Sequence, residues 1–311
     1  VCSSDLLDWT SPSTSSHPKR LRTRTHGSSS APSLPSKSPS LCSLDCRLIN
    51  ARSLKTDSIR NPKRQMLVAE LDAGHLDALF VCETWLCSEV SSAFLCGPSA
   101  SRYEVFRKDR EADLGNGGGV ALFVRSSLSP RPLPFEPRSE LSGCELVMDG
   151  VPIRLLVAYR PPSGTIANQL LYLKGLAIDL KRASSDTTQL VLAGDMNLAD
   201  IEWTESNASS PLARDFLSLA LELGLSQHVL DPTRRANILD LILSHPRELV
   251  FAVSVSPCFL PSDHHQVDFS VSVPPSKRGI CPRKDGRAKK AQSPAPGRVR
   301  RNWKRADYGG M

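Results

Sequence analysis

A chain of 311 residues with 40% hydrophobic content can bury a sizeable core in one large domain or two small ones. No apolar run approaches the roughly 18 residues that a membrane-spanning helix needs, and no charged-then-apolar secretory signal opens the chain. We therefore expect a soluble, intracellular protein that is not secreted and has no membrane partner.

The nine cysteines indicate neither a disulfide framework nor a zinc site. Their number is odd, and no CxxC pair stands at zinc-ligand spacing from histidines. Several lie beside apolar residues, as Cys82 and Cys96 do, so we expect reduced thiols, many of them in the core.

The net charge of +7 is unevenly distributed along the chain. Residues 276–311 contain twelve Lys or Arg and two Asp, and residues 1–40 contain five Lys or Arg and two Asp. Residues 41–275 are therefore net acidic, at −6. A mildly acidic body with basic extensions suits a phosphate-rich partner.

Composition divides the chain into three parts. Residues 1–40 hold thirteen Ser and five Pro with almost no apolar spacing, so they cannot bury enough surface to offset chain entropy, and we predict that they are disordered. Residues 41–275 form the predicted globular domain. Beyond Pro274 the sequence is basic and Pro-rich, and we predict that residues 276–311 are a linker or tail.

The first half of the globular part predicts strands with one helix among them. Residues 77–82 form a continuous apolar run, which is typical of a strand covered on both sides. Asp149 and Gly150 tolerate positive φ, which predicts a hairpin between the strands that flank them. The other predicted elements are strands at 44–49, 119–124, 145–148 and 153–158, and a helix at 65–73 whose buried face is Met66, Val68, Ala69 and Leu71.

The second half repeats this plan. Helices are predicted at residues 166–183 and 212–223, the second of which ends at Gly224. Two halves that each contain strands and covering helices predict an α/β (α+β) fold, a four-layer sandwich of two packed mixed β-sheets flanked by helices. The predicted strands of this half are residues 189–193, 226–230, 238–243, 249–255 and 267–273.

Four short motifs stand at or just past the ends of predicted strands. They are Asn50, Glu83 in CETW, GDMN at residues 194–197, and SDHH at residues 262–265. Each alone is weak, because Asp and Asn are common turn residues after strands. Together they supply what phosphodiester hydrolysis needs, namely carboxylates for a hard divalent cation, a group that deprotonates water, and donors for the developing charge.

The set of motifs resembles the endonuclease/exonuclease/phosphatase superfamily, and among its members most closely the endonucleases of LINE-type (non-LTR) retrotransposons of the chicken-repeat kind. The resemblance covers about residues 44–273. It rests on NARSL (50–54), CETWL (82–86), GNGGGVALFV (115–124), AYRPP (158–162), GDMN (194–197), LDLIL (239–243) and SDHH (262–265). Met196 stands where relatives usually have an aromatic residue, and this flexible apolar side chain can fill similar space.

The resemblance implies roles for individual residues. Glu83 would be the main ligand of a Mg²⁺ ion, with Mn²⁺ as an alternative, and Asn50 and Asp263 would assist it. Asp195 and Asn197 would position the attacking water and the phosphate. Two roles compete with structural interpretations: Tyr159 would donate to a phosphate oxygen or else pack in a hairpin, and Asp240 would polarise His264 or else be a strand-end turn residue.

Cationic segments are candidates for contact with nucleic acid. Arg107, Lys108 and Arg110 precede the glycine run and either contact backbone phosphates or form a charged surface loop. The glycine run lacks the ending of a P-loop and is interpreted as a turn that enters a strand. In the tail, Arg300, Arg301 and Trp303 interleave an aromatic side chain with cations, as binders of single strands or backbones do, or else belong to a solvated linker.

The favoured function is a metal-dependent DNA endonuclease that nicks its target and leaves a 3′-hydroxyl primer for target-primed reverse transcription. Its expected partners are a double-stranded DNA target, the element RNA and a fused reverse transcriptase domain, and its site of action would be the nucleus. Two alternatives remain open at this point: a phosphoesterase of the same fold that acts on another phosphodiester or phosphomonoester, and an inactive fragment that only binds nucleic acid.

Overall fold

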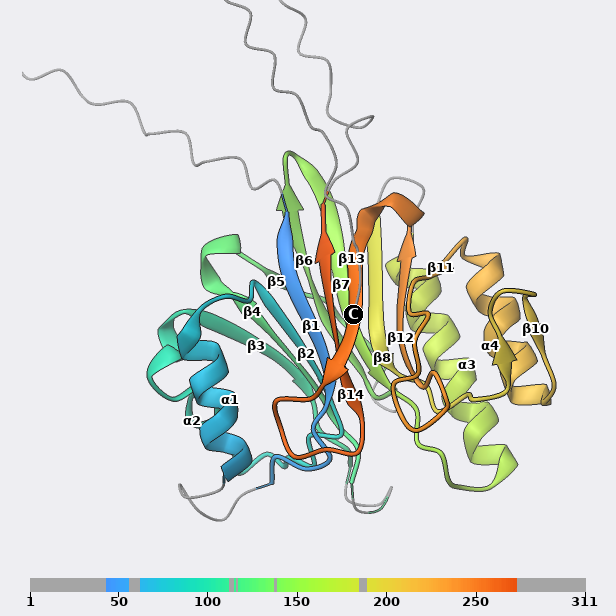
Figure 1. Ribbon diagram of the computed structural model, residues 1–311, viewed down its shortest axis with the longest axis horizontal. Coiled ribbons are helices and arrows are strands. Elements are labelled where there is room, and N and C mark those ends of the chain that lie inside the picture. The colour runs from blue at the N-terminus through green and yellow to red at the C-terminus, as the bar shows by residue number, and fades with distance from the viewer. Residues whose placement is uncertain are drawn as a thin grey trace, which may run out of the picture. The chain divides into compact units, whose positions relative to one another are not determined.

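The first of two six-stranded sheets has the strand order β13-β14-β1-β2-β4-β3 in the computed structural model (Figure 1). Strands β1 and β2 are parallel, and every other pair of neighbours is antiparallel, so the sheet is mixed. The strands are β1 (Leu44–Asn50), β2 (Ala78–Cys82), β3 (Tyr103–Lys108), β4 (Val120–Arg125), β13 (Val250–Pro257) and β14 (His265–Val271).

The second sheet has the order β11-β12-β8-β7-β6-β5 and again contains one parallel pair, β7 with β8. The predicted hairpin joins β6 to β7, with Asp149 at φ 49° and Gly150 at φ 79° between the paired residues Met148 and Val151. The strands are β5 (Arg131–Pro132), β6 (Leu141–Met148), β7 (Val151–Tyr159), β8 (Gln189–Asp195), β11 (Ser226–Gln227) and β12 (Asp240–His245).

Four α-helices lie on the outer faces of the sheets. They are α1 (Pro62–Ala73), α2 (Ser92–Cys96), α3 (Ile166–Ala183) and α4 (Pro211–Glu222). The hydroxyls of Thr165 and Ser210 accept from backbone N–H groups at the starts of α3 and α4 and so cap them. A two-stranded ribbon of β9 (Ile201–Glu202) and β10 (Asn207–Ala208) precedes α4, and the part of the chain that the structure describes also contains the single turns η1 (Gly97–Ser101), η3 (Ser126–Leu128) and η4 (Arg247–Leu249).

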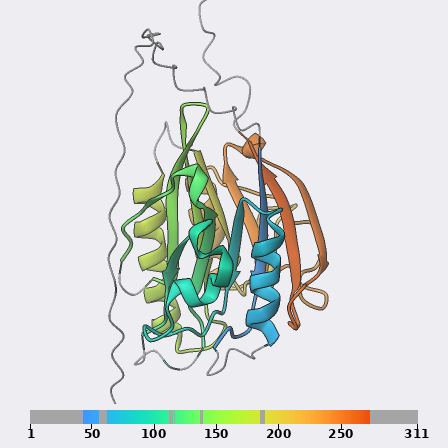
Figure 2. The same cartoon turned by 90° about the vertical axis from the view of Figure 1, so that its left-hand side faces the viewer.

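The core consists of three apolar layers that follow from alternation along the strands. One cluster joins the inward residues of both sheets, such as Leu48 of β1 and Val157 of β7. The alternate residues face outward, where Ile49 packs with α1 and Leu156 packs with α3. Figure 2 shows α1, in blue, in front of the strands of the first sheet. The fold is therefore the predicted α/β sandwich, with helix, sheet, sheet and helix as its four layers.

The structure describes residues 43–55, 62–111, 115, 117–136, 139–184 and 189–272, all within the compact unit Ser40–Met311. The predicted disordered segment 1–40 and basic tail 276–311 lie outside these residues. Within the described part, no helix has the length and apolar character needed to span a membrane. The six described cysteines form no disulfide, and four of them are buried.

Several details of the prediction were wrong. The buried face of α1 consists of Leu67 and Leu71, whereas Met66 is 38% exposed, because the sheet receives the helix at a different rotation from the predicted one. The sequence pattern also missed the short elements α2, β5, β9 and β10, and it missed β3, in which only Tyr103 is fully buried and the last residues are charged.

Candidate active site

The ends of four strands bring chemically active side chains to one place because these side chains all face the interior of the sandwich. Asn50 continues the inward series of β1, and Tyr159, Asp195 and Asp240 do the same on β7, β8 and β12. Strand register keeps them together, since Asn50 pairs with Cys82, and Asp195 pairs with Tyr159 on one side and with Asp240 on the other.

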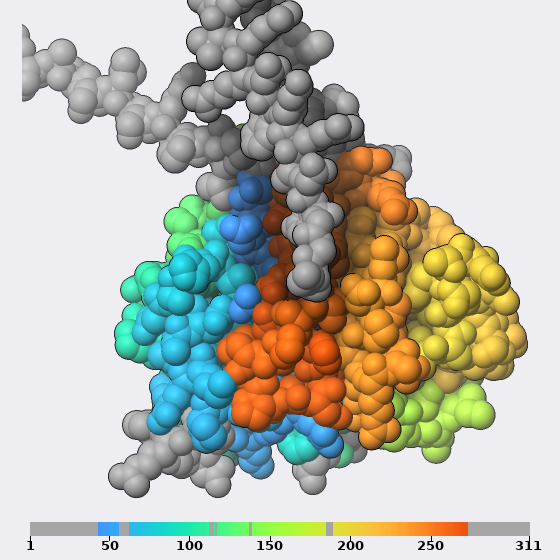
Figure 3. Space-filling view, viewed as in Figure 1, coloured from blue at the N-terminus to red at the C-terminus, as the bar shows by residue number. Residues whose placement is uncertain are grey.

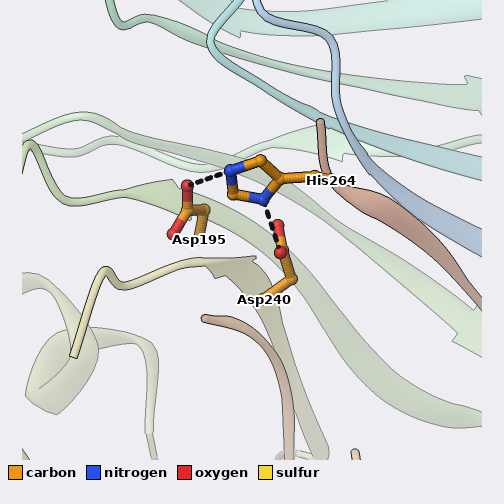
Figure 4. Close-up of side chains that lie close together, drawn as sticks. All are labelled: Asp195, Asp240 and His264. Atoms are coloured by element: carbon orange, nitrogen blue, oxygen red, sulfur yellow. Dashed lines mark hydrogen bonds and ion pairs between the residues drawn. The ribbon is translucent and has the colours of Figure 1, made fainter. Parts of the chain in front are cut away.

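A buried histidine lies between two of these aspartates (Figure 4). His264 Nδ1 is 2.7 Å from Asp240 Oδ2, and His264 Nε2 is 3.9 Å from Asp195 Oδ2. The exposed fractions are 3% for His264, 1% for Asp240 and 0% for Asp195. The first distance is a hydrogen bond that orients the ring, whereas the second is too long for one and leaves Nε2 facing Asp195.

The two carboxylates determine the protonation of this cluster. Burial alone lowers the pKa of His264, but the hydrogen bond and negative charge of Asp240, together with Asp195, raise that pKa overall. Burial and the charge of Asp240 raise the pKa of Asp195 well above its usual value, although His264 opposes this effect. Both shifts therefore favour the protonated forms of His264 and Asp195 over their deprotonated forms.

Asn50 connects the two sheets through its side-chain amide. Its Nδ2 donates to Glu83 Oε1 and to Asp195 Oδ2, each at 2.9 Å, and Arg52 N donates to its Oδ1 at 3.0 Å. The second oxygen of Glu83 accepts from Trp85 Nε1 at 3.2 Å. Both carboxylates are thus held in defined orientations by neutral donors.

The backbone around Glu83 adopts conformations that L-residues rarely adopt. Glu83 and Trp85 have φ of 53° and 55°, and Arg52 and Ser53 have φ of 43° and 83°. Such a residue costs on the order of 1 kcal/mol or more, so surrounding contacts must impose it. Here the contacts are hydrogen bonds between neighbouring loops, including Ser53 N to Glu83 O at 2.8 Å and Trp85 N to Gly118 O at 2.8 Å.

Asn197 lies in the turn that follows β8, with φ of 48°. Its backbone N donates to Asp195 Oδ1 at 3.0 Å, and its side-chain Nδ2 donates to the carbonyl of Arg160 at 2.9 Å. The GDMN motif therefore orients Asp195 from within its own turn.

Tyr159 is almost completely buried beside an ion pair. Burial, followed by the charges of Glu83 and Asp195, raises the pKa of Tyr159, so its hydroxyl stays protonated and remains a hydrogen-bond donor. The guanidinium of Arg110 lies 5.7 Å from the ring centroid and donates through Nε to Glu140 at 2.6 Å. Glu140 also accepts from the backbone N of Gly119 at 2.6 Å.

Asp263 lies next to this group but has other partners. Its Oδ2 accepts from Arg234 at 2.5 Å, and its Oδ1 is 3.0 Å from Arg52. Burial alone would raise the pKa of Asp263, but these two arginines lower it overall. The space-filling view shows the segment before β14 beside the loop before β12 (Figure 3). The ion pair between Asp263 and Arg234 joins these two segments. The structure thus unites Asn50 and Glu83 of the predicted metal ligands and places Asp263 in an arginine-bound position.

The predicted nucleic-acid contacts are found in different environments. Arg107 donates to the carbonyls of Cys87 and Val90 and pairs with Asp109, so its guanidinium is committed internally, as is that of Arg110. Among Arg107, Lys108 and Arg110, Lys108 has the most exposed side chain. Arg300, Arg301 and Trp303 lie outside the described residues.

Sequence reasoning left two supporting hydroxyl groups without a role. Ser262 Oγ donates to the carbonyl of Asn50 at 2.7 Å and accepts from His264 N at 3.2 Å, which ties the histidine to β1. Thr233 Oγ1 accepts from Asp240 N at 3.1 Å. The position of Ser262 inside SDHH was a signal for the first, whereas no local pattern marks Thr233.

Comparison with models of protein families classifies this site. The model of the Endonuclease/Exonuclease/phosphatase family matches residues 49–264, which is more than half of the chain and spans every residue from Asn50 to His264. The chain belongs to this family. A comparison with curated protein sequences finds no match.

Solved structures of several endonuclease/exonuclease/phosphatase proteins have the same fold. The endonuclease domain of TRAS1, a telomere-specific non-LTR retrotransposon, matches with a TM-score of 0.55 and 15% identity over 74% of this chain and 98% of its own. An AP endonuclease from Archaeoglobus fulgidus gives 0.56 and 19% over 74% and 100%. A 3′ phosphatase from Neisseria, bound to product DNA hairpin, gives 0.55 and 18% over 74% and 100%. At these identities the likeness establishes the fold alone.

Enzymes of the endonuclease/exonuclease/phosphatase family use divalent metal ions, and the side chains here fit such an ion. Glu83 and Asp195 offer carboxylate oxygens, the hard ligands that suit Mg²⁺ or Mn²⁺ rather than zinc, and Asn50 Nδ2 donates to both carboxylates. Asp195, Asp240 and His264 also have ligand atoms within 4.8 Å of one another. Asp240 Oδ2 and His264 Nδ1 are already bonded to each other, so the carboxylate oxygens that could hold an ion lie on the Glu83 side of the site.

Proposed function

We propose that this protein is a divalent-metal-dependent endonuclease that nicks DNA and leaves a 3′-hydroxyl as the primer for reverse transcription, as in a LINE-type element. The proposal rests on two groups of side chains that meet at Asp195, where the strands of both sheets end. Asn50 links Glu83 to Asp195, and His264 lies between Asp195 and Asp240. Together these groups provide an oxygen-rich ion site beside an acid/base pair.

The protein side chains divide the chemistry among themselves. A Mg²⁺ ion held by Glu83 and Asn50 would stabilise negative charge on the phosphate. Asp195 accepts from Asn50 Nδ2 and Asn197 N, which aim its carboxylate toward the attacking water. His264, with Asp240 bonded to Nδ1, presents Nε2 as the donor or acceptor of a proton at the phosphate.

Tyr159 completes the set as a neutral donor. Because burial, with Glu83 and Asp195, raises the pKa of its hydroxyl, this group can donate to a phosphate oxygen without losing its own proton at neutral pH. The ring is supported by Arg110, which Glu140 holds. The site therefore has donors for the developing charge in addition to the ion.

A nicking role in retrotransposition, rather than repair or phosphatase activity, is supported by the residues that resemble LINE endonucleases, from NARSL to SDHH. The TRAS1 endonuclease domain shares the fold. We propose a double-stranded DNA target, with the element RNA and a fused reverse transcriptase domain as further partners, and the nucleus as the place of action.

Incubation of the full chain with supercoiled plasmid and Mg²⁺ tests the proposal. We expect open-circular DNA whose nick a polymerase extends directly, because the product carries a 3′-hydroxyl, and no product in EDTA. Glu83→Gln should abolish nicking, whereas Glu104→Gln on the exposed side of β3 is the control that should not. Full activity in EDTA would refute metal dependence. Cleavage restricted to abasic sites, or release of phosphate from 3′-phosphorylated ends without nicking, would assign one of the other activities.

A further inference from the structure

Arg160 is a buried cation next to the site that has no role in the chemistry above. It follows β7 directly, and only 4% of its surface is exposed. The acceptors of its side-chain hydrogen bonds are neutral oxygens of Pro161, Gln169, Met196 and Asn197. Burial of a charge is costly, so an arginine in this position indicates a need for its particular geometry.

The guanidinium holds the turn after β8 by two short hydrogen bonds. Nε donates to the carbonyl of Met196 and one terminal nitrogen donates to the carbonyl of Asn197, both at 2.6 Å. Asn197 returns a hydrogen bond from its side chain to the carbonyl of Arg160 at 2.9 Å. The two residues therefore fix each other in both directions.

The same turn orients the carboxylate of Asp195. Asn197 has φ of 48°, a conformation that an asparagine tolerates but that its surroundings must maintain. In this conformation its backbone N donates to Asp195 Oδ1 at 3.0 Å. On the other side of the turn, Met196 N donates to the carbonyl of Leu239 at 2.9 Å, so Arg160 supplies the tether on the side of β7.

We propose that Arg160 is a positioning residue for the reaction: its guanidinium clamps the carbonyls of Met196 and Asn197 and thereby sets the orientation of Asp195 and Asn197. This inference rests on the proposed function for its kinetic consequence, but the clamp itself is testable without activity. A lysine cannot replace it, because an ammonium lacks the planar fork that donates to two carbonyls in fixed directions.

Arg160→Lys should lower the kcat of nicking by about 10- to 10²-fold while KM changes less than about threefold, because misplacement of a reacting group affects the transition state more than binding. Arg154→Lys is the matched control. Arg154 lies on β7, the strand that Arg160 follows, pairs with Glu145 and donates to the carbonyl of Ala183, away from the site. The expected result is a loss of kcat in Arg160→Lys and not in Arg154→Lys, with thermal unfolding showing that both variants are folded.

Guanidinium ion gives a second test of the same clamp. Arg160→Ala should regain part of its lost kcat when guanidinium chloride is added below denaturing concentrations, and the Arg154→Lys chain should not respond. Wild-type kcat in folded Arg160→Lys, or no rescue of folded Arg160→Ala, would overturn the proposal.

The wild-type chain also offers a test that requires no variant and no activity. Nε–H of Arg160 is buried and bonded at 2.6 Å, so its ¹⁵N–¹H resonance should exchange with water far more slowly than that of Arg52, whose side chain is 56% exposed. Equal exchange rates would overturn the clamp. If exchange is slow and the wild-type chain nicks no DNA, the proposed function fails and the clamp stands.

Discussion

The hydrogen bond between Asp240 and His264 gives the sharpest test of the mechanism. Nδ1 and Oδ2 are 2.7 Å apart and both side chains are buried, which is the geometry of a charge-assisted bond worth about 1.5–3 kcal/mol. At about 1.4 kcal/mol per tenfold change in rate, Asp240→Asn should slow nicking by about 10- to 10²-fold. His264→Ala, which removes the acid/base group itself, should cost about 10²- to 10⁴-fold.

The double variant decides whether the pair acts as one unit. If Asp240 works only through His264, the double variant should be little slower than His264→Ala. If the two residues work separately, the losses should multiply to about 10³- to 10⁶-fold. The rate of single-turnover plasmid nicking is measured for the wild type, the two single variants and the double variant. His265→Ala, which changes the exposed neighbouring histidine, is the control. Multiplied losses would refute the assignment of Asp240 as the partner of His264.

Titration of His264 by NMR provides an independent check with a defined sign. Asp240 raises the pKa of His264 against the opposing effect of burial, so Asp240→Asn should lower this pKa. In the wild-type chain the protonated imidazole contributes stability that is fully present below the unfolded pKa of about 6.5 and is lost as pH rises through the raised folded pKa. Asp240→Asn should remove this part of the pH dependence of unfolding.

Three further predictions concern other parts of the chain. Removal of residues 276–311 should weaken DNA binding and reduce its salt dependence while the saturated nicking rate changes little, and an unchanged salt slope in equilibrium titrations would make the tail a passive linker. Gly194→Ala should destabilise the fold by about 2 kcal/mol in urea unfolding because a Cβ would overlap the carbonyl of Ala158 beneath the site, whereas Gly175→Ala, with open space around it, should not. Burial, followed by Arg247, lowers the pKa of His228 to about 4, so the unfolded chain binds this proton more readily than the folded chain. The free energy of unfolding should therefore fall by about 1–2 kcal/mol, a value discounted for partial exposure, as pH drops from about 6.5 to about 4. Unfolding of His228→Gln over this range should lack that loss, and a pH dependence equal to that of the wild type would exclude His228 as its source.

Local sequence patterns determined most elements of the fold and the type of chemistry at the site. The segment 77–82, which is uninterruptedly apolar after Asp77, predicted a strand buried on both faces, as β2 is. Asp149 and Gly150 predicted the hairpin that joins β6 to β7. These features are local, because alternation and turn conformation depend on neighbouring residues. The same reasoning placed Asn50, Glu83 and Asp195 at or just past strand ends, whereas the role of Asp240 came from the family resemblance.

Tertiary structure alone decided which side chains meet. Asn50 bonds to Asp195 across 145 positions of sequence, and this contact depends on how the two sheets are stacked. Tertiary structure also decides the environment of each cation, because a charged sequence segment does not reveal whether its side chains are buried in ion pairs. Arg110 was interpreted as a candidate phosphate contact, yet Glu140 holds it beside Tyr159. Asp263 likewise has two arginines as partners, from loops that are distant in the sequence.

The role of Arg160 shows the same division most clearly. Its position in AYRPP was part of the family resemblance, but nothing in the local pattern distinguishes a buried arginine from an exposed one after a strand. Its partners are backbone carbonyls of Met196 and Asn197, and every residue has such a carbonyl, so no sequence signal can mark them. Sequence determines which donors a chain carries and which strands alternate, whereas the packing of β7 beside β8 determines which carbonyls those donors reach.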